Sequence, residues 1–244
     1  SPSIGLAASG NGNISSFVAT NSTGNPVTAT ITVTPTYLGC LGSSQTFTYT
    51  INPTPTVVQP SNQTVCSGVS TSTVIFSGTA GSTYNWTNSN STIGLASSGT
   101  GDINSFTPVN TSASPISSVI TVTPVIGTCF GQPQSFNFTI NPTPIISGNT
   151  VLCPSTTSQL TGSGIPASSN AWISSTSSIA TVSNSGLVSA LSFGSTIITY
   201  TSNLGCSTNT TINVTNPTTP TFNPINSICS GGTIQLATSS TNSI

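Results

Sequence analysis

TFTYTINPTP at residues 46–55 and SFNFTINPTP at residues 135–144 are two versions of one segment, and both alternate apolar and polar residues. In the first version, threonines separate Phe47, Tyr49 and Ile51. Because successive side chains of a β-strand point to opposite faces of the sheet, this alternation predicts a strand with one buried and one solvated face. The Pro-Thr-Pro run that follows predicts a domain junction, since proline cannot donate a hydrogen bond to a sheet.

The duplication extends beyond this segment. IGLAASGNGNISSF (4–17) returns 89 residues later as IGLASSGTGDINSF (93–106), with ten of fourteen positions identical. Residues 1–53 and 90–142 are therefore copies of one unit. The second copy is preceded by further strand-like segments, such as STYNWTNSN (82–90), which have no counterpart before the first copy.

A unit of another kind follows, and its clearest part is NAWISSTSSIATVSNSGLVSALSFGSTIITY (170–200). After it, PTTPTFNPINSICSGG (217–232) restarts the pattern of PTPTVVQPSNQTVCSG (53–68). Short strands separated by Gly, Asn and Ser turns at roughly ten-residue spacing are typical of β-sandwiches. The sequence thus predicts an all-β linear array with four parts: a partial domain at 1–53, complete β-sandwiches at 54–142 and 143–216, and the start of a further domain at 217–244.

The chain has no Lys, Arg or His, and its only acidic residue is Asp102. Nucleic acids and anionic lipids are bound mainly through Lys and Arg, so we expect neither as a partner. No run of about 18 apolar residues is present, so we expect no membrane insertion. Acid–base catalysis relies on groups that are nearly absent here, and a serine nucleophile needs a base. We therefore expect no enzyme, no catalytic residue and no cofactor.

The glycine-rich repeat invites comparison with a dinucleotide-binding loop, which needs a third glycine and a following helix. Neither copy has these features, so we predict a turn or short edge segment in which glycine supplies a positive φ or a close backbone approach. Asp102 is matched by Asn13 in the first copy, which predicts local hydrogen bonding in a turn. A calcium site would need several oxygen ligands, so no metal site is expected.

The two tryptophans, Trp86 and Trp172, occupy comparable places in their domains. An exposed ring there could stack on a sugar. Immunoglobulin-like sandwiches, however, usually bury a tryptophan on the corresponding strand. We therefore predict that both are core residues.

Six cysteines recur at repeating positions in a chain without a CxxC pair or a histidine, which favours disulfides in an oxidising compartment over a metal site. One set lies at hairpin turns near the ends of domains (Cys40, Cys129, Cys206). The other set lies near the beginnings of domains (Cys66, Cys153, Cys229).

Three pairings follow from this arrangement. Pairing across the linkers gives 40–66, 129–153 and 206–229. Pairing within domains gives 66–129 and 153–206. The third option joins the opening cysteine of one domain to the turn cysteine of the next, which gives 66–206.

The two cysteines of one domain would lie about 25 Å apart at roughly 3.3 Å per strand residue, whereas a disulfide needs Cα atoms within about 7 Å. This favours 66–206. The within-domain pairs stay open, because a strand that switches sheets could bring them together.

The unit containing Trp172, SSIATVSNSGLVSAL (177–191) and Gly194 followed by STIITY resembles bacterial immunoglobulin-like domains of group 2. The duplicated unit, with STYNWTNSN, IGLASSGTG and TINPTP, resembles the PKD-like repeats of giant secreted surface proteins of the Bacteroidota. Together the resemblances imply tandem immunoglobulin-like and PKD-like β-sandwiches in an extracellular cell-surface adhesin, of the gliding-motility type exported by the type IX system.

The expected function is therefore a structural stalk or adhesive repeat region of a large surface protein. Its partners would be neighbouring domains of the same polypeptide, together with surface glycans or secretion and anchoring proteins. Two alternatives stay open, namely a module that itself binds glycans or surfaces, and a subunit of a self-assembling extracellular filament. The latter arises because 217–244 supplies opening strands and 1–53 supplies closing strands.

Overall fold

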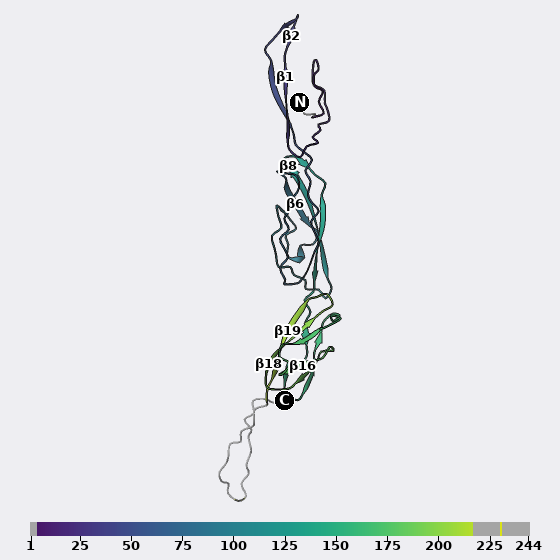
Figure 1. Cartoon of the computed structure of the whole chain (residues 1–244), viewed down its shortest axis with the longest axis vertical. Helices are drawn as coiled ribbons and strands as arrows, with labels where there is room; N and C mark the ends of the chain where they lie inside the picture. The colour runs from purple at the N-terminus through teal and green to yellow at the C-terminus, as the bar shows by residue number, and fades with distance from the viewer. Residues whose placement is uncertain (1–3, 217–229, 231–244) are drawn as a thin grey trace. The chain divides into compact units, whose positions relative to one another are not determined.

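The structure is a computed structural model that describes residues 4–216 and Ser230. Its secondary structure consists of short β-strands, and the only helical element among the described residues is the single 3-10 turn η1 (Ser91–Ile93) (Figure 1). The predicted all-β fold is confirmed. The chain divides into two compact units, residues 1–142 and 143–244. The finer division into four domains stays a prediction, and its fourth member, 217–244, lies outside the described part except for Ser230.

The second half of the first unit contains one large sheet, in which Figure 1 labels β6 and β8. Strand β5 (Gln63–Cys66) lies parallel to β10 (Gln134–Asn141), and the remaining neighbours are antiparallel. Isolated bridges between Val57 and Gly78 and between Val74 and Ile103 join segments outside this sheet. The order of the sheet is β5 (Gln63–Cys66), β10 (Gln134–Asn141), β8 (Ile116–Ile126), β6 (Thr83–Asn88) and β7 (Ser98–Thr100), and β9 (Cys129–Phe130) pairs with β8.

The core of this domain is formed by the apolar positions of the alternating pattern. Phe136, Phe138 and Ile140 on β10 are all buried, as their spacing of two residues requires. They pack in one cluster with side chains from the segments that precede the duplicated unit. The cluster members from those preceding segments are Val57, Val74, Phe76 and Trp86.

The first copy of the duplicated unit forms a hairpin of β1 (Val27–Val33) and β4 (Gln45–Ile51), with β2 (Thr36–Tyr37) and β3 (Cys40–Leu41) pairing next to its turn. Val27 opposes Ile51, which is the register that Ile116 and Ile140 repeat 89 residues later. The backbone pairing of the two copies is therefore the same.

The two copies also share side-chain hydrogen bonds, which are made by two asparagines that the sequence analysis did not identify. The amide of Asn21 donates to the Ile51 carbonyl at 2.8 Å, and that of Asn110 donates to the Ile140 carbonyl at 2.7 Å. Each also accepts a backbone N–H two residues further along, from Thr23 and Ser112. The only advance signal was their spacing of 89 residues.

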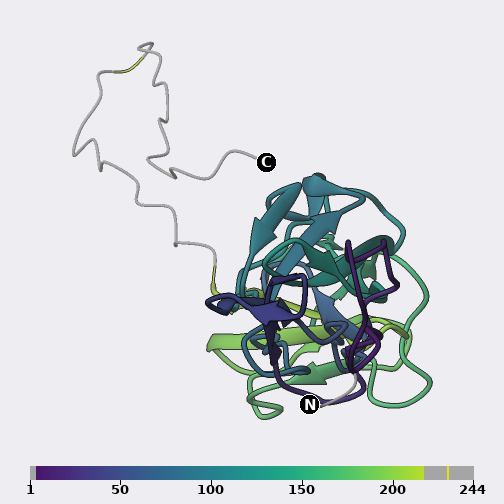
Figure 2. The ribbon, with the colours of Figure 1, turned by 90° about the horizontal axis from the view of Figure 1, so that it is seen from above.

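The second unit contains two main sheets, and its strands β18 and β19 form a long antiparallel hairpin, drawn in yellow-green (Figures 1 and 2). One sheet has the order β12 (Val151–Leu152), β19 (Ser207–Val214), β18 (Gly194–Thr201) and β15 (Trp172–Ser174). The other has the order β13 (Thr157–Gln159), β17 (Leu187–Ala190) and β16 (Ala180–Val182), and β11 (Ile146–Ser147) pairs separately with β14 (Thr161–Gly162).

The core of the second unit has its own aromatic pair. The rings of Trp172 and Tyr200 lie 4.6 Å apart between centroids, and both side chains are buried. Leu160, Val188 and Ile198 belong to the same cluster. Each unit therefore contains a separate small core made from alternating strand positions.

Candidate functional site

Among the described residues, cysteines recur at comparable places in the fold. Cys66 and Cys206 are disulfide-bonded, whereas Cys40, Cys129 and Cys153 are free thiols. The within-domain and across-linker pairings both require Cys129 and Cys153 to be bonded, so both are wrong for this structure. Cys66 and Cys206 are in the bonded state that the favoured alternative, 66–206, requires of each, and the pairing itself stays a prediction. Cys229 lies outside the described residues.

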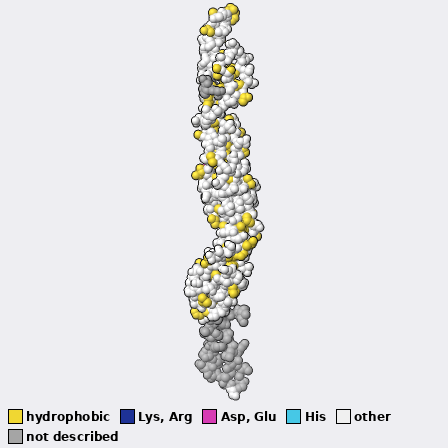
Figure 3. Space-filling model, turned by 45° about the vertical axis from the view of Figure 1, so that its right-hand side comes forward, with side chains coloured by type: hydrophobic (Ala, Val, Ile, Leu, Met, Phe, Trp, Pro, Cys, Tyr) yellow, Lys and Arg dark blue, Asp and Glu magenta, His cyan; other side chains and the backbone are white. Residues whose placement is uncertain are grey.

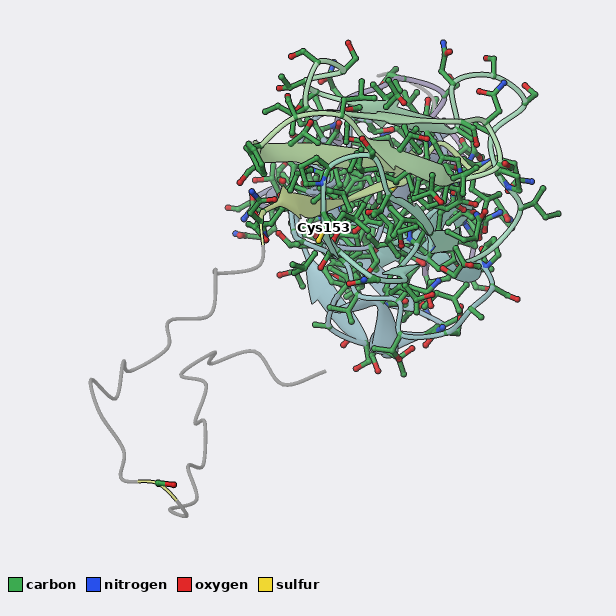
Figure 4. The ribbon with its side chains drawn as sticks, turned by 90° about the horizontal axis from the view of Figure 1, so that it is seen from below. Cys153 is labelled. Atoms are coloured by element: carbon green, nitrogen blue, oxygen red, sulfur yellow. The ribbon has the colours of Figure 1, made fainter. Side chains whose placement is uncertain are left out.

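The three free cysteines are accessible to different degrees. Cys40 and Cys153 are exposed and Cys129 is half-buried. Cys40 and Cys129 occupy the same hairpin turn of the two copies. Cys153, labelled in Figure 4, directly follows β12, which pairs with β19.

Asp102, the only charged side chain, makes a hydrogen bond that is not local. Its Oδ1 accepts the backbone N–H of Phe76 at 2.8 Å, across 26 residues of chain. The expectation of a local turn bond is therefore wrong for Asp102, because the bridge between Val74 and Ile103 brings the two segments together. The carboxylate helps to hold the segment that supplies Phe76 to the core.

Replacing Asp102 by alanine should lower the free energy of unfolding of the predicted 54–142 domain by about 1–2 kcal/mol, because the Phe76 N–H loses its acceptor. Asp102→Asn keeps an acceptor oxygen and should lose less than about half of that. Urea unfolding, together with hydrogen exchange at the Phe76 amide, measures both effects. Equal losses in the two variants would show that the charge matters rather than the hydrogen bond.

The glycine-rich stretch of the second copy forms η1 and the short edge strand β7. Gly94 and Gly101 adopt positive φ angles of 94° and 71°. Gly99 opposes Trp86 in the β6–β7 pair, and a Cβ at Gly99 would lie 2.2 Å from the Trp86 ring. The stretch is thus a structural connector in which one glycine makes room for a core tryptophan.

Neither tryptophan offers an exposed ring face. Trp86 and Trp172 are each 7% exposed and belong to the two cores, and the Trp86 indole N–H donates to the Gly101 carbonyl at 3.1 Å. A cleft of about 190 Å³ lies beside Trp172, and its polar lining comes from Gln159, Asn184 and Ser185. Gln159 already donates to the Ser185 and Leu160 carbonyls. The cleft is smaller than the roughly 300–1,000 Å³ that is usual for small-molecule sites.

Few groups in the described part of the chain can titrate. There, no three His, Cys, Asp or Glu residues gather in a way that could hold a metal ion, and no helix is long and apolar enough to cross a membrane. Burial raises the pKa of Tyr200. Burial, and secondarily the Asp102 carboxylate, raises the pKa of Tyr84.

These pKa directions predict how stability depends on pH. A raised tyrosine pKa leaves stability unchanged while the phenol is protonated in both states, and stability falls once the unfolded state ionises first. Because the chain has no His, Lys, Arg or Glu, the free energy of unfolding should be flat from about pH 5 to 8 and fall above about pH 10. Urea unfolding at a series of pH values measures this. A maximum inside the flat range would contradict it.

The surface is polar, and in the described part of the chain it carries one charged side chain, the exposed Asp102. On the face that Figure 3 shows, apolar side chains form scattered patches among uncharged polar groups. Hydroxyl groups often bond to one another across strands, as in Thr28 with Thr50 at 3.0 Å and Thr201 with Ser207 at 2.9 Å. Such a surface lacks the charged side chains with which edge strands usually discourage association.

Comparisons with known proteins find a family model that matches part of the chain. Residues 137–214 match the model of the bacterial Ig-like domain (group 2). This region contains most of the second unit, including Trp172 and the β18–β19 hairpin. The chain therefore contains an immunoglobulin-like repeat in this region. Among curated proteins, no sequence matches the chain significantly.

Several solved structures are similar at low identity. A C-terminal fragment of intimin, solved in complex with the intimin-binding domain of its translocated receptor, is 19% identical (TM-score 0.35; 56% of this chain and 52% of that chain). The insect immune protein hemolin is 17% identical (TM-score 0.34; 76% and 55%). Sidekick-1 immunoglobulin domains 1–5 are 17% identical (TM-score 0.32; 70% and 40%). The chain spans about half of the intimin fragment that it matches.

Proposed function

We propose that this chain is part of the repeat region of a large secreted cell-surface adhesin, in which it acts as a structural stalk or adhesive segment. The disulfide and the immunoglobulin-like domain fit an extracellular protein. The Bacteroidota origin, the gliding-motility role and export by the type IX system belong to this proposal and rest on the sequence resemblance described above.

One observation carries the proposal. The same hydrogen-bonded unit is built twice, 89 residues apart, down to the equivalent asparagines Asn21 and Asn110. An immunoglobulin-like domain follows in the same chain. Serial small sandwiches, each with its own core, are suited to extending a polypeptide from a surface. The partners would be neighbouring domains of that polypeptide, and secretion or anchoring proteins.

The second candidate function is direct binding of glycans by the cleft beside Trp172. The observation in its favour is the amide and hydroxyl lining supplied by Gln159, Asn184 and Ser185. The observation against it is that Trp172 and Tyr200 are buried and present no ring face on which a sugar could stack. The structural role is therefore the better supported of the two.

A glycan array and adsorption measurements on the 244-residue chain separate the two functions. The structural role predicts no binding above background. Saturable glycan binding that is lost in Asn184→Ala, and kept in the control Asn209→Ala outside the cleft, would support the binding module instead. Both asparagines lie on the surface of the second unit, so neither change should prevent folding.

A further inference from the structure

Asn11 and Gly12 form the only Asn-Gly pair in the sequence. The carboxamide of an asparagine can be attacked by the backbone nitrogen of the next residue, and the side chain of that residue normally shields this nitrogen. Glycine has no Cβ, so its nitrogen is open and its backbone can turn to bring the nitrogen close. Each of the other asparagines is followed by a residue that has a side chain. The sequence therefore offers this reaction its clearest path at Asn11.

The fold leaves the Asn-Gly pair accessible. Residues 11–13 form a bend outside any strand, and all three are exposed. Gly12 has a φ of 81°, and a Cβ built on it would meet nothing within 4 Å beyond its chain neighbours. In the described part of the chain there is thus room for the Gly12 nitrogen to approach the Asn11 side chain.

The Asn11 side chain is also unrestrained. The equivalent asparagines Asn21 and Asn110 donate their amide groups to backbone carbonyls at 2.8 and 2.7 Å. Such hydrogen bonds hold the carboxamide in place, and they must break before it can react. Among the residues that the structure describes, none forms a hydrogen bond with the Asn11 side chain. The Asn11 carboxamide is therefore free to turn toward Gly12.

We propose that Asn11 is a site of spontaneous modification, at which asparagine is converted to aspartate and isoaspartate without an enzyme. The Gly12 nitrogen attacks Cγ of Asn11 and loses its proton, and the side-chain nitrogen leaves as ammonia. A succinimide ring closes, and water then opens it. Opening at Cγ gives aspartate, whereas opening at the backbone carbonyl gives isoaspartate, in which the main chain runs through Cβ and Cγ.

The reaction balances with water as the only co-reactant. A C–N bond forms between Cγ and the Gly12 nitrogen, and the bond between Cγ and the side-chain nitrogen breaks. Hydrolysis then breaks one C–N bond of the ring, so that one water is consumed, one ammonia is released and nothing is oxidised. Because the attacking nitrogen must lose its proton, conversion should be faster at alkaline than at weakly acidic pH.

The modification changes the charge of the chain. The formal net charge is −1, from Asp102, and the new carboxylate makes it −2. No Lys or Arg is present to pair with that carboxylate. The later copy of the repeat has Thr100 before Gly101 and cannot react in this way. The reaction therefore makes the two copies different, and it adds a charge of the kind that discourages association between exposed strands.

Peptide mapping of the 244-residue chain tests the site. After incubation at neutral pH, chymotrypsin should release residues 7–17, which contain both Asn11 and Asn13. This peptide should gain about 1 Da, and electron-transfer fragmentation should place the gain at Asn11 at least about tenfold more often than at Asn13. Asn13 is an internal control, because it is exposed in the same bend but is followed by isoleucine.

Three variants separate the asparagine from its glycine neighbour. Gly12→Ala keeps Asn11 and should slow its conversion at least about fivefold, because the added Cβ shields the nitrogen. Asn11→Gln should abolish the conversion, since glutamine would have to close a larger ring. Asn13→Gln is the matched control and should leave the rate unchanged. All three positions lie in an exposed bend, so no variant should disturb the domains.

Isoaspartate labelling gives a second readout. A methyltransferase specific for isoaspartate, supplied with a radioactive methyl donor, should label the incubated chain and its Asn13→Gln variant. It should not label Asn11→Gln.

An Asn11 that stays unmodified at alkaline pH, or modification that is equal at Asn11 and Asn13, would overturn the inference. A Gly12→Ala variant that reacts as fast as the unaltered chain would also overturn it. The inference goes beyond the proposed structural role and does not depend on it. The mass and the methyl label report chemistry at Asn11, whereas the glycan and adsorption measurements decide that role separately.

Discussion

Replacing Phe138 by alanine should lower the free energy of unfolding of the predicted 54–142 domain by about 3–5 kcal/mol, the range for removing a buried aromatic ring and leaving a cavity. Phe138 is completely buried and makes edge contacts with Phe106 and Phe136, at 5.3 and 5.4 Å between centroids. Strand β10 lies between β5 and β8 in the sheet, so the cavity left by the missing ring cannot close easily. Urea unfolding, with hydrogen exchange at the amides of β8 and β10, measures the loss.

The first copy supplies a matched control. Tyr49 stands where Phe138 stands in the repeat, but it is 37% exposed and its main ring contacts are Phe17 and Phe47. Tyr49→Ala should therefore cost less than about 1 kcal/mol in the monomeric chain. A loss as large as that of Phe138→Ala would show that Tyr49 is as tightly packed as Phe138, which would contradict its 37% exposure.

Gly99→Ala should destabilise the same domain by about 1–3 kcal/mol, the usual cost of overpacking a filled core. The added Cβ would lie 2.2 Å from Cζ2 of Trp86, which is closer than real Cβ contacts allow. Trp86 cannot turn aside freely, because its indole N–H is bonded to the Gly101 carbonyl. The variant should also change the near-UV circular dichroism and the tryptophan fluorescence as the ring moves.

Gly10 provides the corresponding control. It occupies the place of Gly99 in the first copy, but a Cβ there would meet nothing within 4 Å. Gly10→Ala should therefore leave the fluorescence unchanged and alter stability by no more than about 0.5 kcal/mol. If the two alanine variants behaved alike, the glycine at this position of the repeat would serve its backbone rather than Trp86.

The glycine stretch shows how far reading the sequence could go. The missing third glycine and the absence of a following helix excluded a nucleotide loop, and a turn or close backbone approach was the prediction that remained. Gly94 and Gly101 fit it through their positive φ angles. The requirement for glycine at position 99 could not be predicted from the sequence, because it depends on contact with a tryptophan in another strand.

Asp102 marks a second limit. The Asn13/Asp102 exchange correctly indicated a hydrogen-bonding residue, but the partner, Phe76, lies 26 residues away. Sequence patterns predict interactions between residues that are close along the chain. Contacts between strands also depend on the strand register and on how the segments cross. The cysteines show the same division. Their spacing allowed three pairings, and only the folded chain excluded the two that need Cys129 and Cys153 to be bonded.

The sequence by itself determined the all-β class, the 89-residue repeat and the alternation that assigns Phe136, Phe138 and Ile140 to one face. These features are local, because a strand's two-residue period and a proline's missing N–H act within a few residues. The tertiary structure alone decided that the same alternating face is buried in one copy and open in the other. Burial depends on what lies opposite a strand, and the strand's own sequence does not contain that partner.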